Sequence, residues 1–298
     1  MHNYVLITPA RNEEKYIAHT IQSIIAQTVQ PLAWIIVSDN SIDKTDEIVN
    51  EYVNRYPFIK LIRVVSEKKR NFGAQVRAFL KGYELIKDLQ YDFIGNLDAD
   101  VSFERDYYKK VIGQFALDNK LGLAGGFIFE KQNGVFRCRK HNSTDSVAHA
   151  VQLFRRECFL KINGYVPLRY GGSDSVAETK VRMNGWNVKA FPWLEVYHHK
   201  PTLGAEGKYN GAFRQGLMDY SIGIPSFFEL LRCLIRASDS PIYSVCRYTG
   251  FIWAIIKRNP REVDVDTIRF LKKEQKRKFI STMERVFISK SQPKASTQ

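Results

Sequence analysis

Tyr91-Asp-Phe-Ile-Gly-Asn-Leu97, followed by Asp98-Ala-Asp100, is the most informative segment of the chain. The apolar run predicts a buried strand, and a helix-like stretch from Arg105 to Leu117 comes after the acidic triplet. Two carboxylates on alternate residues at a strand's end are badly placed for packing, but hard cations such as Mg²⁺ and Mn²⁺ prefer carboxylate oxygens. The triplet alone is a weak signal, since a solvated loop or a helix cap carries the same residues.

The residues before this stretch alternate between strand-like and helix-like patterns. We expect strands at residues 4–9, 33–38, 59–65 and 92–97, separated by helices with apolar faces around residues 17–25, 48–53 and 76–83. This alternation predicts an α/β fold with a mainly parallel, nucleotide-binding sheet flanked by helices. Ligands of such sheets bind at the carboxyl ends of the strands, where Asp39, Asp98 and Asp100 fall.

The first strand–helix turn, Thr8-Pro-Ala-Arg-Asn-Glu-Glu14, excludes two common classes of nucleotide-binding protein. It has no Gly-x-Gly-x-x-Gly, so the backbone cradle of a dinucleotide-binding dehydrogenase is missing. The chain also has no Gly-Lys-Ser/Thr loop of a P-loop NTPase. The acidic strand ends indicate instead that phosphate is bound through a metal ion.

The second half of the chain has a mixed pattern. We expect strands at residues 121–129, 135–139, 187–191 and 194–197, and a helix at 175–184 that stops at Gly185. An apolar helical face follows at residues 227–235, and 242–256 is the most apolar stretch. Arg247 interrupts that stretch, which leaves it far below the ~20 residues needed to span a bilayer. A core helix and a basic amphipathic helix on a membrane remain equal alternatives.

Length and charge predict two parts. The 298 residues suit one large or two modest domains, and we expect a catalytic domain at 1–225 and a basic, amphipathic helical extension at 226–298, disordered from about Ser289. The formal net charge is +14, and residues 257–298 hold twelve Lys and Arg against five Asp and Glu, a net charge of +7. Such a concentration favours a polyanionic neighbour, although a solvated tail explains it equally well.

The cysteines and the N-terminus indicate a cytoplasmic protein. The four cysteines lie far apart without a Cys-x-x-Cys, which is typical of a reduced intracellular protein rather than a disulfide scaffold. Residues 1–10 lack the basic leader and apolar stretch of a signal peptide.

The motifs, taken in order, resemble those of a family 2 glycosyltransferase with the glycosyltransferase A fold, over about residues 4–200. Thr8-Pro-Ala-Arg-Asn-Glu-Glu14 resembles the family's opening Pro-x-x-Asn-Glu segment. Ser38-Asp-Asn-Ser-Ile-Asp-Lys-Thr45 resembles Asp-Asp-Gly-Ser-x-Asp-x-Thr, with Asn40 and Ser41 in place of the second Asp and the Gly. Lys69-Arg-Asn-Phe-Gly-Ala-Gln-Val-Arg77 resembles its basic Gly-x-Ala segment, and Asp98-Ala-Asp100 matches its Asp-x-Asp motif.

The resemblance continues beyond these motifs. Phe154-Arg-Arg156, followed by Ile162-Asn-Gly-Tyr165, resembles the acceptor-side segment. Ser173-Asp174 falls where the family carries Glu-Asp, so the catalytic base is kept and its neighbouring carboxylate is replaced. Val196-Tyr-His-His199 resembles a segment that supplies a metal-binding histidine. The Gln-x-x-Arg-Trp of processive synthases is absent from the sequence, which favours transfer of a single sugar.

The resemblance implies a metal-dependent, inverting enzyme that moves one sugar from a nucleotide-diphosphate sugar to an acceptor hydroxyl. Asp100, with Asp98 nearby, would hold Mg²⁺ or Mn²⁺, and Asp174 would be the general base. Because adjacent strand residues point to opposite faces, at most one of His198 and His199 binds the metal, and His198 is preferred. The donor would contact Pro9, Glu13, Asp39, Arg70 and Asp98.

Structural alternatives stand beside several of these roles. Asp174 also suits a helix N-cap, Asp39 an Asx-turn, and Glu13 the first turn of a helix. Lys68-Lys69-Arg70 equally suits a solvated loop, and Arg155 and Arg156 suit surface ion pairs rather than the acceptor side.

The expected partners are the nucleotide-sugar donor, a glycan or lipid-linked acceptor and an anionic membrane surface, but no nucleic acid. The enzyme would serve polysaccharide, glycolipid or glycoprotein glycan synthesis, peripherally at the inner face of the cell membrane. One alternative is a sugar-phosphate nucleotidyltransferase, which usually opens with a Gly-rich basic loop where this chain has Asn12-Glu13-Glu14. Another is a non-catalytic polyanion-binding protein, although the basic residues are spread over many elements without a nucleic-acid motif.

Overall fold

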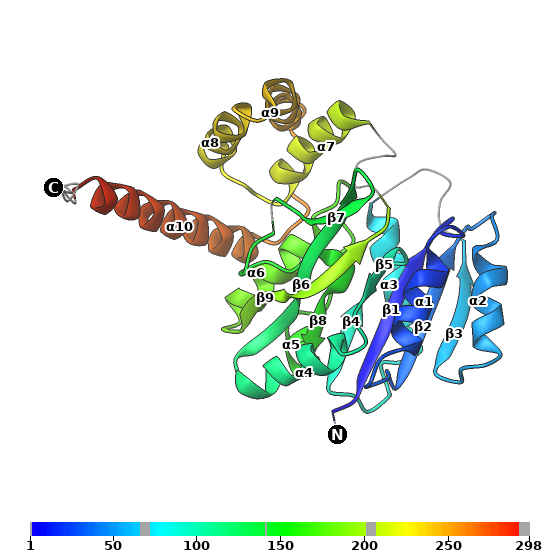
Figure 1. Ribbon diagram of the computed structural model, residues 1–298. Helices are drawn as coiled ribbons and strands as arrows, with labels where there is room; N and C mark the ends of the chain where they lie inside the picture. Colours follow the sequence, from blue (N-terminus) through cyan, green and yellow to red (C-terminus); the bar gives the residue numbers. More distant parts are fainter. Residues whose placement is uncertain (1, 66–71, 141, 201–206, 292–298) are drawn as a thin grey trace. The chain divides into compact units, whose positions relative to one another are not determined.

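The structure is a computed structural model that describes residues 2–65, 72–140, 142–200 and 207–291, with side chains to residue 280. The chain divides into two compact units, residues 1–206 and 207–298. The first unit contains the β-sheet and the second consists of helices (Figure 1). The helix Lys208–Ser221 belongs with the second unit. The domain boundary expected after residue 225 stays a prediction.

The strands of the described residues form one sheet. They are β1 (Tyr4–Ala10), β2 (Ala33–Asp39), β3 (Ile59–Val64), β4 (Phe93–Asn96), β5 (Val101–Phe103), β6 (Leu121–Gln132), β7 (Val135–Cys138), β8 (Leu153–Arg155) and β9 (Asn187–His198). Their order is β3-β2-β1-β4-β8-β6-β9-β5, with β7 paired to β6. The strands β3, β2, β1 and β4 are parallel, as the alternation of strands and helices predicts. Beyond β4 the sheet is mixed, since β8 runs antiparallel to both of its neighbours.

The strand β9 joins two segments that the sequence divides. Residues 187–191 and 194–197 were expected as separate strands, but they form one strand that pairs with β6 through a register shift after Gly126. Pro192 falls in this irregular stretch, where its missing N–H costs no ladder hydrogen bond. The continuous strand carries its last residue, His198, to the pairing with Val101 of β5.

Helices cover both faces of the sheet. On one face lie α1 (Ile17–Ile25), α2 (Thr45–Val53) and α4 (Tyr107–Leu117), and on the other α3 (Gly73–Glu84), α5 (Arg156–Lys161) and α6 (Ser173–Met183). Along β1, Tyr4 and Leu6 belong to the first core, whereas Val5 and Ile7 belong to the second. Because every residue of such a strand is buried on one face or the other, it appears as a continuous apolar run.

The two loops that carry the first motifs are tied to each other. The Asn12 backbone N–H donates to the Ser41 hydroxyl, and the Asn12 side-chain carbonyl accepts from the Ile42 N–H. The Glu13 N–H donates to the Thr45 hydroxyl at 2.7 Å. The Asn-Glu and Ser-x-Asp-x-Thr patterns therefore form a structural clasp, a set of hydrogen bonds that joins the loops after β1 and β2.

The second unit contains α7 (Lys208–Ser221), α8 (Ser226–Ala237), α9 (Pro241–Ile256) and α10 (Val265–Ser291). The helices α7 and α9 approach closely because Gly216 has no side chain: a Cβ there would lie 1.9 Å from the Arg247 carbonyl oxygen. Arg247, which interrupts the apolar stretch, is buried and pairs with Asp219 and Glu229. The tail expected to be disordered begins inside α10, and its residues 292–298 lie outside the described part.

None of the helices in the described ranges is both long enough and apolar enough to cross a bilayer.

Candidate active site

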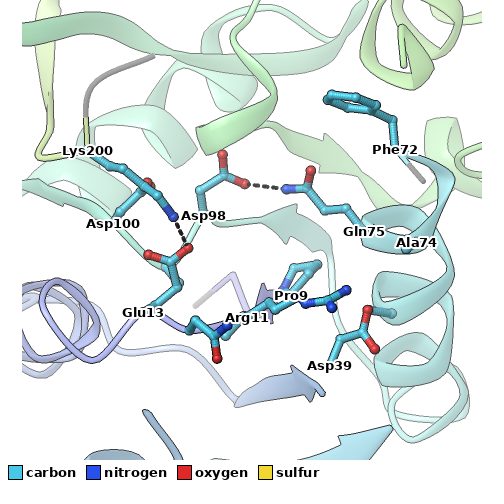
Figure 2. A pocket seen from close by; sticks show the side chains of 14 residues that line it. Pro9, Arg11, Glu13, Asp39, Phe72, Ala74, Gln75, Asp98, Asp100 and Lys200 are labelled. Atoms are coloured by element: carbon cyan, nitrogen blue, oxygen red, sulfur yellow. Dashed lines mark hydrogen bonds and ion pairs between the residues drawn. The ribbon is translucent and has the colours of Figure 1, made fainter. Parts of the chain in front are cut away.

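A pocket of about 520 Å³ opens at the carboxyl ends of β1, β2 and β4 (Figure 2). This volume is in the range of small-molecule sites. The pocket is lined by Pro9, Ala10, Arg11, Asn12, Glu13, Asp39, Phe72, Ala74, Gln75, Ala78, Asp98, Ala99, Asp100 and Lys200. The structure thus brings together five predicted site residues: Pro9, Glu13, Asp39, Asp98 and Asp100. Arg70 lies outside the described residues.

Asp39 reaches the pocket because β2 ends with it. The residue is buried, and the chain turns away at once through Asn40, whose φ is +55°. Asparagine adopts this left-handed conformation more readily than most residues do. This explains why the chain can turn at Asn40.

Asp98 is held by three side chains. Its Oδ1 accepts hydrogen bonds from Gln75 of α3 at 3.0 Å and from Asn96 of β4 at 3.3 Å, and the His149 Nδ1 lies 3.7 Å away. Burial raises the pKa of Asp98, but the neighbouring His149 and the hydrogen bond from Asn96 outweigh it and hold this pKa below its usual value. Asp98 is therefore a fixed carboxylate at the pocket wall, as Figure 2 shows for its bond to Gln75.

Asp100 lies against His198. The pairing of β5 with β9 brings the His198 Nε2 to 3.3 Å from the Asp100 Oδ1. Asp100 is only 7% exposed, and its Oδ1 has no hydrogen-bond partner. His199 points elsewhere: its Nε2 lies 2.8 Å from the Ser102 hydroxyl and its ring stacks on His19. The site thus has a buried carboxylate oxygen and an imidazole nitrogen side by side.

Lys200 forms an ion pair with Glu13 inside the pocket. The Lys200 Nζ lies 2.5 Å from the Glu13 Oε1, and Figure 2 shows the two side chains meeting beside Asp100. Burial raises the pKa of Glu13 to about 7, although Lys200 acts to lower it. The negative charges of Asp100 and Asp98 add to the rise.

Asp174 is the second residue of α6 and does not line the pocket. The N-cap of α6 is Gly172, and no side chain makes a capping hydrogen bond, so Asp174 is not the N-cap. Its charge acts on His149, whose pKa Asp98 and Asp174 raise against the effect of burial. Burial together with the charge of Asp174 raises the pKa of Glu178 to about 7. Asp174 is thus part of an ionisable cluster that reaches Asp98 through His149.

The sequence reasoning missed Lys200, Gln75 and His149. Lys200 directly follows the two histidines. Its positive charge, which suits a pocket expected to hold phosphate, was the one signal in the sequence that could have pointed to it. His149 begins a short 3₁₀ helix, His149–Val151, which is too short to give a periodic sequence pattern. Arg155, an acceptor-side candidate, instead donates to the Phe115 and Leu121 carbonyl oxygens, which makes it a packing residue.

An α/β sheet whose acidic strand ends border a pocket is typical of enzymes that bind a ligand at the carboxyl ends of their strands. Residues 5–173 match the model of glycosyl transferase family 2, and the chain belongs to this family. A curated relative, the 4,4'-diaponeurosporenoate glycosyltransferase of Staphylococcus aureus, is 33% identical over 119 residues. This match covers 40% of the chain and spans only 29% of the relative's length.

Several solved structures share the fold. The mannosyltransferase PcManGT of Pyrobaculum calidifontis, in complex with GDP-Man and Mn²⁺, is 17% identical with a TM-score of 0.53, over 72% of this chain and 61% of the other. TarS of S. aureus with UDP-GlcNAc is 16% identical with a TM-score of 0.51, over 73% and 66%. GalNAc-T7 with UDP, GalNAc and Mn²⁺ is 14% identical with a TM-score of 0.56, over 88% and 58%. These likenesses establish the glycosyltransferase A fold.

Proposed function

We propose that this protein is a metal-dependent, inverting glycosyltransferase that moves one sugar from a nucleotide-diphosphate sugar to an acceptor hydroxyl. The observation that carries the proposal is the contact between Asp100, which lines the strand-end pocket, and His198, which lies behind it and outside the pocket lining. Family membership supports the transfer of a sugar. The metal and the donor contacts are proposed from the chemistry of the pocket residues, and the inverting stereochemistry from the resemblance of the sequence motifs.

The Asp100–His198 pair fits a divalent cation. Two neighbouring ligands of an octahedral ion, each at about 2.1 Å, lie about 3 Å apart, close to the 3.3 Å between the two atoms. The unpartnered Asp100 Oδ1 is a buried acceptor that a cation would satisfy. Across the described ranges no group of three or more His, Cys, Asp and Glu gathers for a metal. Two protein ligands still suffice, because Mg²⁺ typically takes its other ligands from water and substrate phosphates.

The choice between Mg²⁺ and Mn²⁺ depends on which protein atoms bind the ion. Asp100 supplies a carboxylate oxygen, which suits both ions, whereas an imidazole such as that of His198 is a softer ligand. Two solved structures with this fold contain Mn²⁺, which supports a divalent ion here. When bound, the ion would act as a Lewis acid that offsets the charge developing on the leaving diphosphate.

The donor's nucleoside would lie against Pro9, Asp39 and Asp98. Because Gln75 and Asn96 fix the Asp98 Oδ1, its second oxygen is oriented to accept a hydrogen bond from a ribose hydroxyl. Asp39 would accept from the base or the ribose. The sequence also assigns Glu13 and Arg70 to the donor. In the structure, Glu13 forms an ion pair with Lys200.

Asp174 would act as the general base. In an inverting transfer, the acceptor oxygen bonds to the anomeric carbon while the bond from that carbon to the diphosphate oxygen breaks. The proton of the acceptor hydroxyl passes to the Asp174 carboxylate, which must come within hydrogen-bond reach. The absence of a capping bond from Asp174 supports a role other than helix capping.

We propose a lipid-linked or membrane-proximal acceptor, reached by peripheral binding at an anionic membrane. The helix α8 buries Glu229 but exposes Phe227, Leu234 and Ile235, which are 59%, 63% and 67% exposed. An amphipathic helix that presents its apolar side outward suits an interface with lipid. Exposed basic residues of α10, namely Lys272, Lys273, Lys276, Arg277 and Lys278, supply the charge that anionic lipids attract.

The experiment that tests the proposed function incubates the protein with UDP- and GDP-sugars, Mn²⁺ and candidate lipid or glycan acceptors. A family 2 enzyme of this kind releases the nucleotide diphosphate and forms a product whose anomeric configuration, read by NMR, is opposite to that of the donor. Retention of configuration would refute the inverting mechanism. Formation of a nucleotide sugar from a nucleoside triphosphate and a sugar phosphate would favour the nucleotidyltransferase alternative.

A further inference from the structure

The pocket has an unusual balance of charge for a site that receives a diphosphate. Its described lining residues include four carboxylates, Glu13, Asp39, Asp98 and Asp100, against the two cations Arg11 and Lys200. A nucleotide diphosphate adds further negative charge. Even with a divalent cation at Asp100, a positive side chain must reach the phosphates if the repulsion between anions is to be overcome.

Lys200 is a cation of the pocket that lies next to the proposed metal pair in the sequence. It follows His198 by two residues, and Figure 2 shows its side chain beside Asp100. Its Nζ pairs with Glu13, but 44% of the side chain is exposed, whereas only 12% of the Glu13 side chain is. The lysine therefore reaches into the open pocket from outside, and the glutamate is the fixed, buried partner.

Glu13 is held in a way that does not depend on Lys200. Its backbone N–H donates to the Thr45 hydroxyl, which belongs to the clasp between the β1 and β2 loops. Its second oxygen, Oε2, is buried without a hydrogen-bond partner, so the carboxylate is incompletely satisfied even with Lys200 in place. A buried carboxylate that loses its cation would normally be costly, but one whose pKa is about 7 takes up a proton instead.

We propose that Lys200 binds the diphosphate of the donor. In the empty site Lys200 pairs with Glu13, so donor binding replaces the Glu13 carboxylate with the diphosphate as the anionic partner of Lys200. This inference rests on the proposed function, because it needs a nucleotide diphosphate in the pocket. Lys200 is then a residue that contacts substrate, and Glu13 is a positioning residue that acts through it.

The test measures the binding of UDP, GDP and their monophosphates, with Mn²⁺, by calorimetry. A charge-assisted hydrogen bond contributes enough that K200M should bind the diphosphate of the preferred base about 10-fold or more weakly. The loss for the monophosphate should be smaller, and K200R should restore most of the affinity. The matched control is K189M, which removes a lysine of similar exposure that pairs with Asp118.

Variants of Glu13 provide the second part of the binding experiment. Because E13Q removes the competing carboxylate, it should bind the diphosphate more tightly than the wild type, and this gain should shrink in the E13Q/K200M double variant. If E13Q instead weakens binding, Glu13 contacts the nucleotide directly and the exchange is wrong. Equal affinity of K200M and wild type, with only a lower melting temperature, would reduce the pair to a structural ion pair. If the wild type binds neither UDP nor GDP, the proposed function itself fails, and the inference fails with it.

Discussion

The Nε2 of His198 lies 3.3 Å from the Oδ1 of Asp100, although 98 positions separate the two residues in the chain. The pairing of Val101 with His198 between β5 and β9 brings them together. One of the two residues follows a parallel strand of the first half of the sheet, and the other ends a long strand of the second half. The proposed metal site therefore depends on the complete sheet of the first unit.

Asp174→Asn tests the general base. The variant should keep its affinity for the nucleotide diphosphate and lose transfer by about 10²- to 10⁴-fold, the usual contribution of a positioned base. Kinetics of transfer and calorimetry of donor binding separate the two effects. Ser175→Ala, an exposed neighbour on the same helix turn, is the control and should be close to wild type. Normal turnover by the Asn variant would remove the catalytic role.

Donor binding should take up protons near pH 7 through Glu13. The charges that act on Glu13 are Lys200, at the end of β9, and Asp100 and Asp98, after β4. When Lys200 moves to the diphosphate, its lowering effect disappears and the pKa of Glu13 rises above about 7. Because the bound state then holds the proton more tightly, affinity should increase as the pH falls toward about 7 and level off below it.

The measurement for this linkage is binding calorimetry at about pH 7 in two buffers of different ionisation enthalpy. The number of protons taken up should be larger for the wild type than for E13Q, because only the wild type has the titrating carboxylate. The difference between the two proteins isolates Glu13 from other titrating groups. Identical uptake by both proteins would contradict the exchange.

Arg247→Met should strongly destabilise the second unit. The substitution removes the buried cation that Asp219 and Glu229 share and leaves them only the partly exposed Arg232, and breaking a buried pair costs about 3–5 kcal/mol. Arg232→Met is the control, because Arg232 contacts the same two carboxylates from a partly exposed position. It should cost about 1 kcal/mol or less. Denaturant unfolding compares the two, and equal losses would count against a buried network centred on Arg247.

Apolar residues of α8 should determine binding to anionic vesicles. L234S/I235S in the full chain should weaken co-sedimentation with phosphatidylserine-containing vesicles by about 10-fold or more, because two side chains no longer enter the lipid. L117S, which changes an apolar residue that is 81% exposed on α4, is the control. Wild-type binding should decrease at high salt. Vesicle binding that is absent, or equal in all three proteins, would remove the membrane role.

The sequence predicts the first half of the sheet well because its signal is local. Continuous apolar runs mark β1, β2 and β4, and the acidic residues that end them fall at one edge, since the carboxyl ends of parallel strands meet there. Asp39, Asp98 and Asp100 could be assigned to one pocket for this reason. The resemblance to the family supplied the pair His198 and His199, and strand periodicity limited the metal ligand to one of the two, with His198 preferred.

The remaining contacts depend on pairing across long stretches of chain. Nothing local indicates that Lys200 meets Glu13, since the register of β9 sets that contact. His149 reaches Asp98 from a 3₁₀ helix that is too short to give a periodic sequence pattern. Arg155 occupies a motif that resembles the family's acceptor-side segment. Its guanidinium nevertheless donates hydrogen bonds to backbone carbonyl oxygens in and near α4. Residue type and motif position therefore predict which groups are charged, and tertiary packing decides which of them meet.

The most direct test of the account is the effect of Mn²⁺ on nucleotide diphosphate binding by wild type and Asp100→Ala. Calorimetry with UDP and GDP, with Mn²⁺ or with EDTA, should show a metal-dependent gain in affinity for the wild type. In the variant this gain should disappear while the melting temperature stays close to that of the wild type, since the Asp100 Oδ1 makes no hydrogen bond that the fold requires. The same Mn²⁺-dependent affinity in both proteins would contradict the proposed metal site.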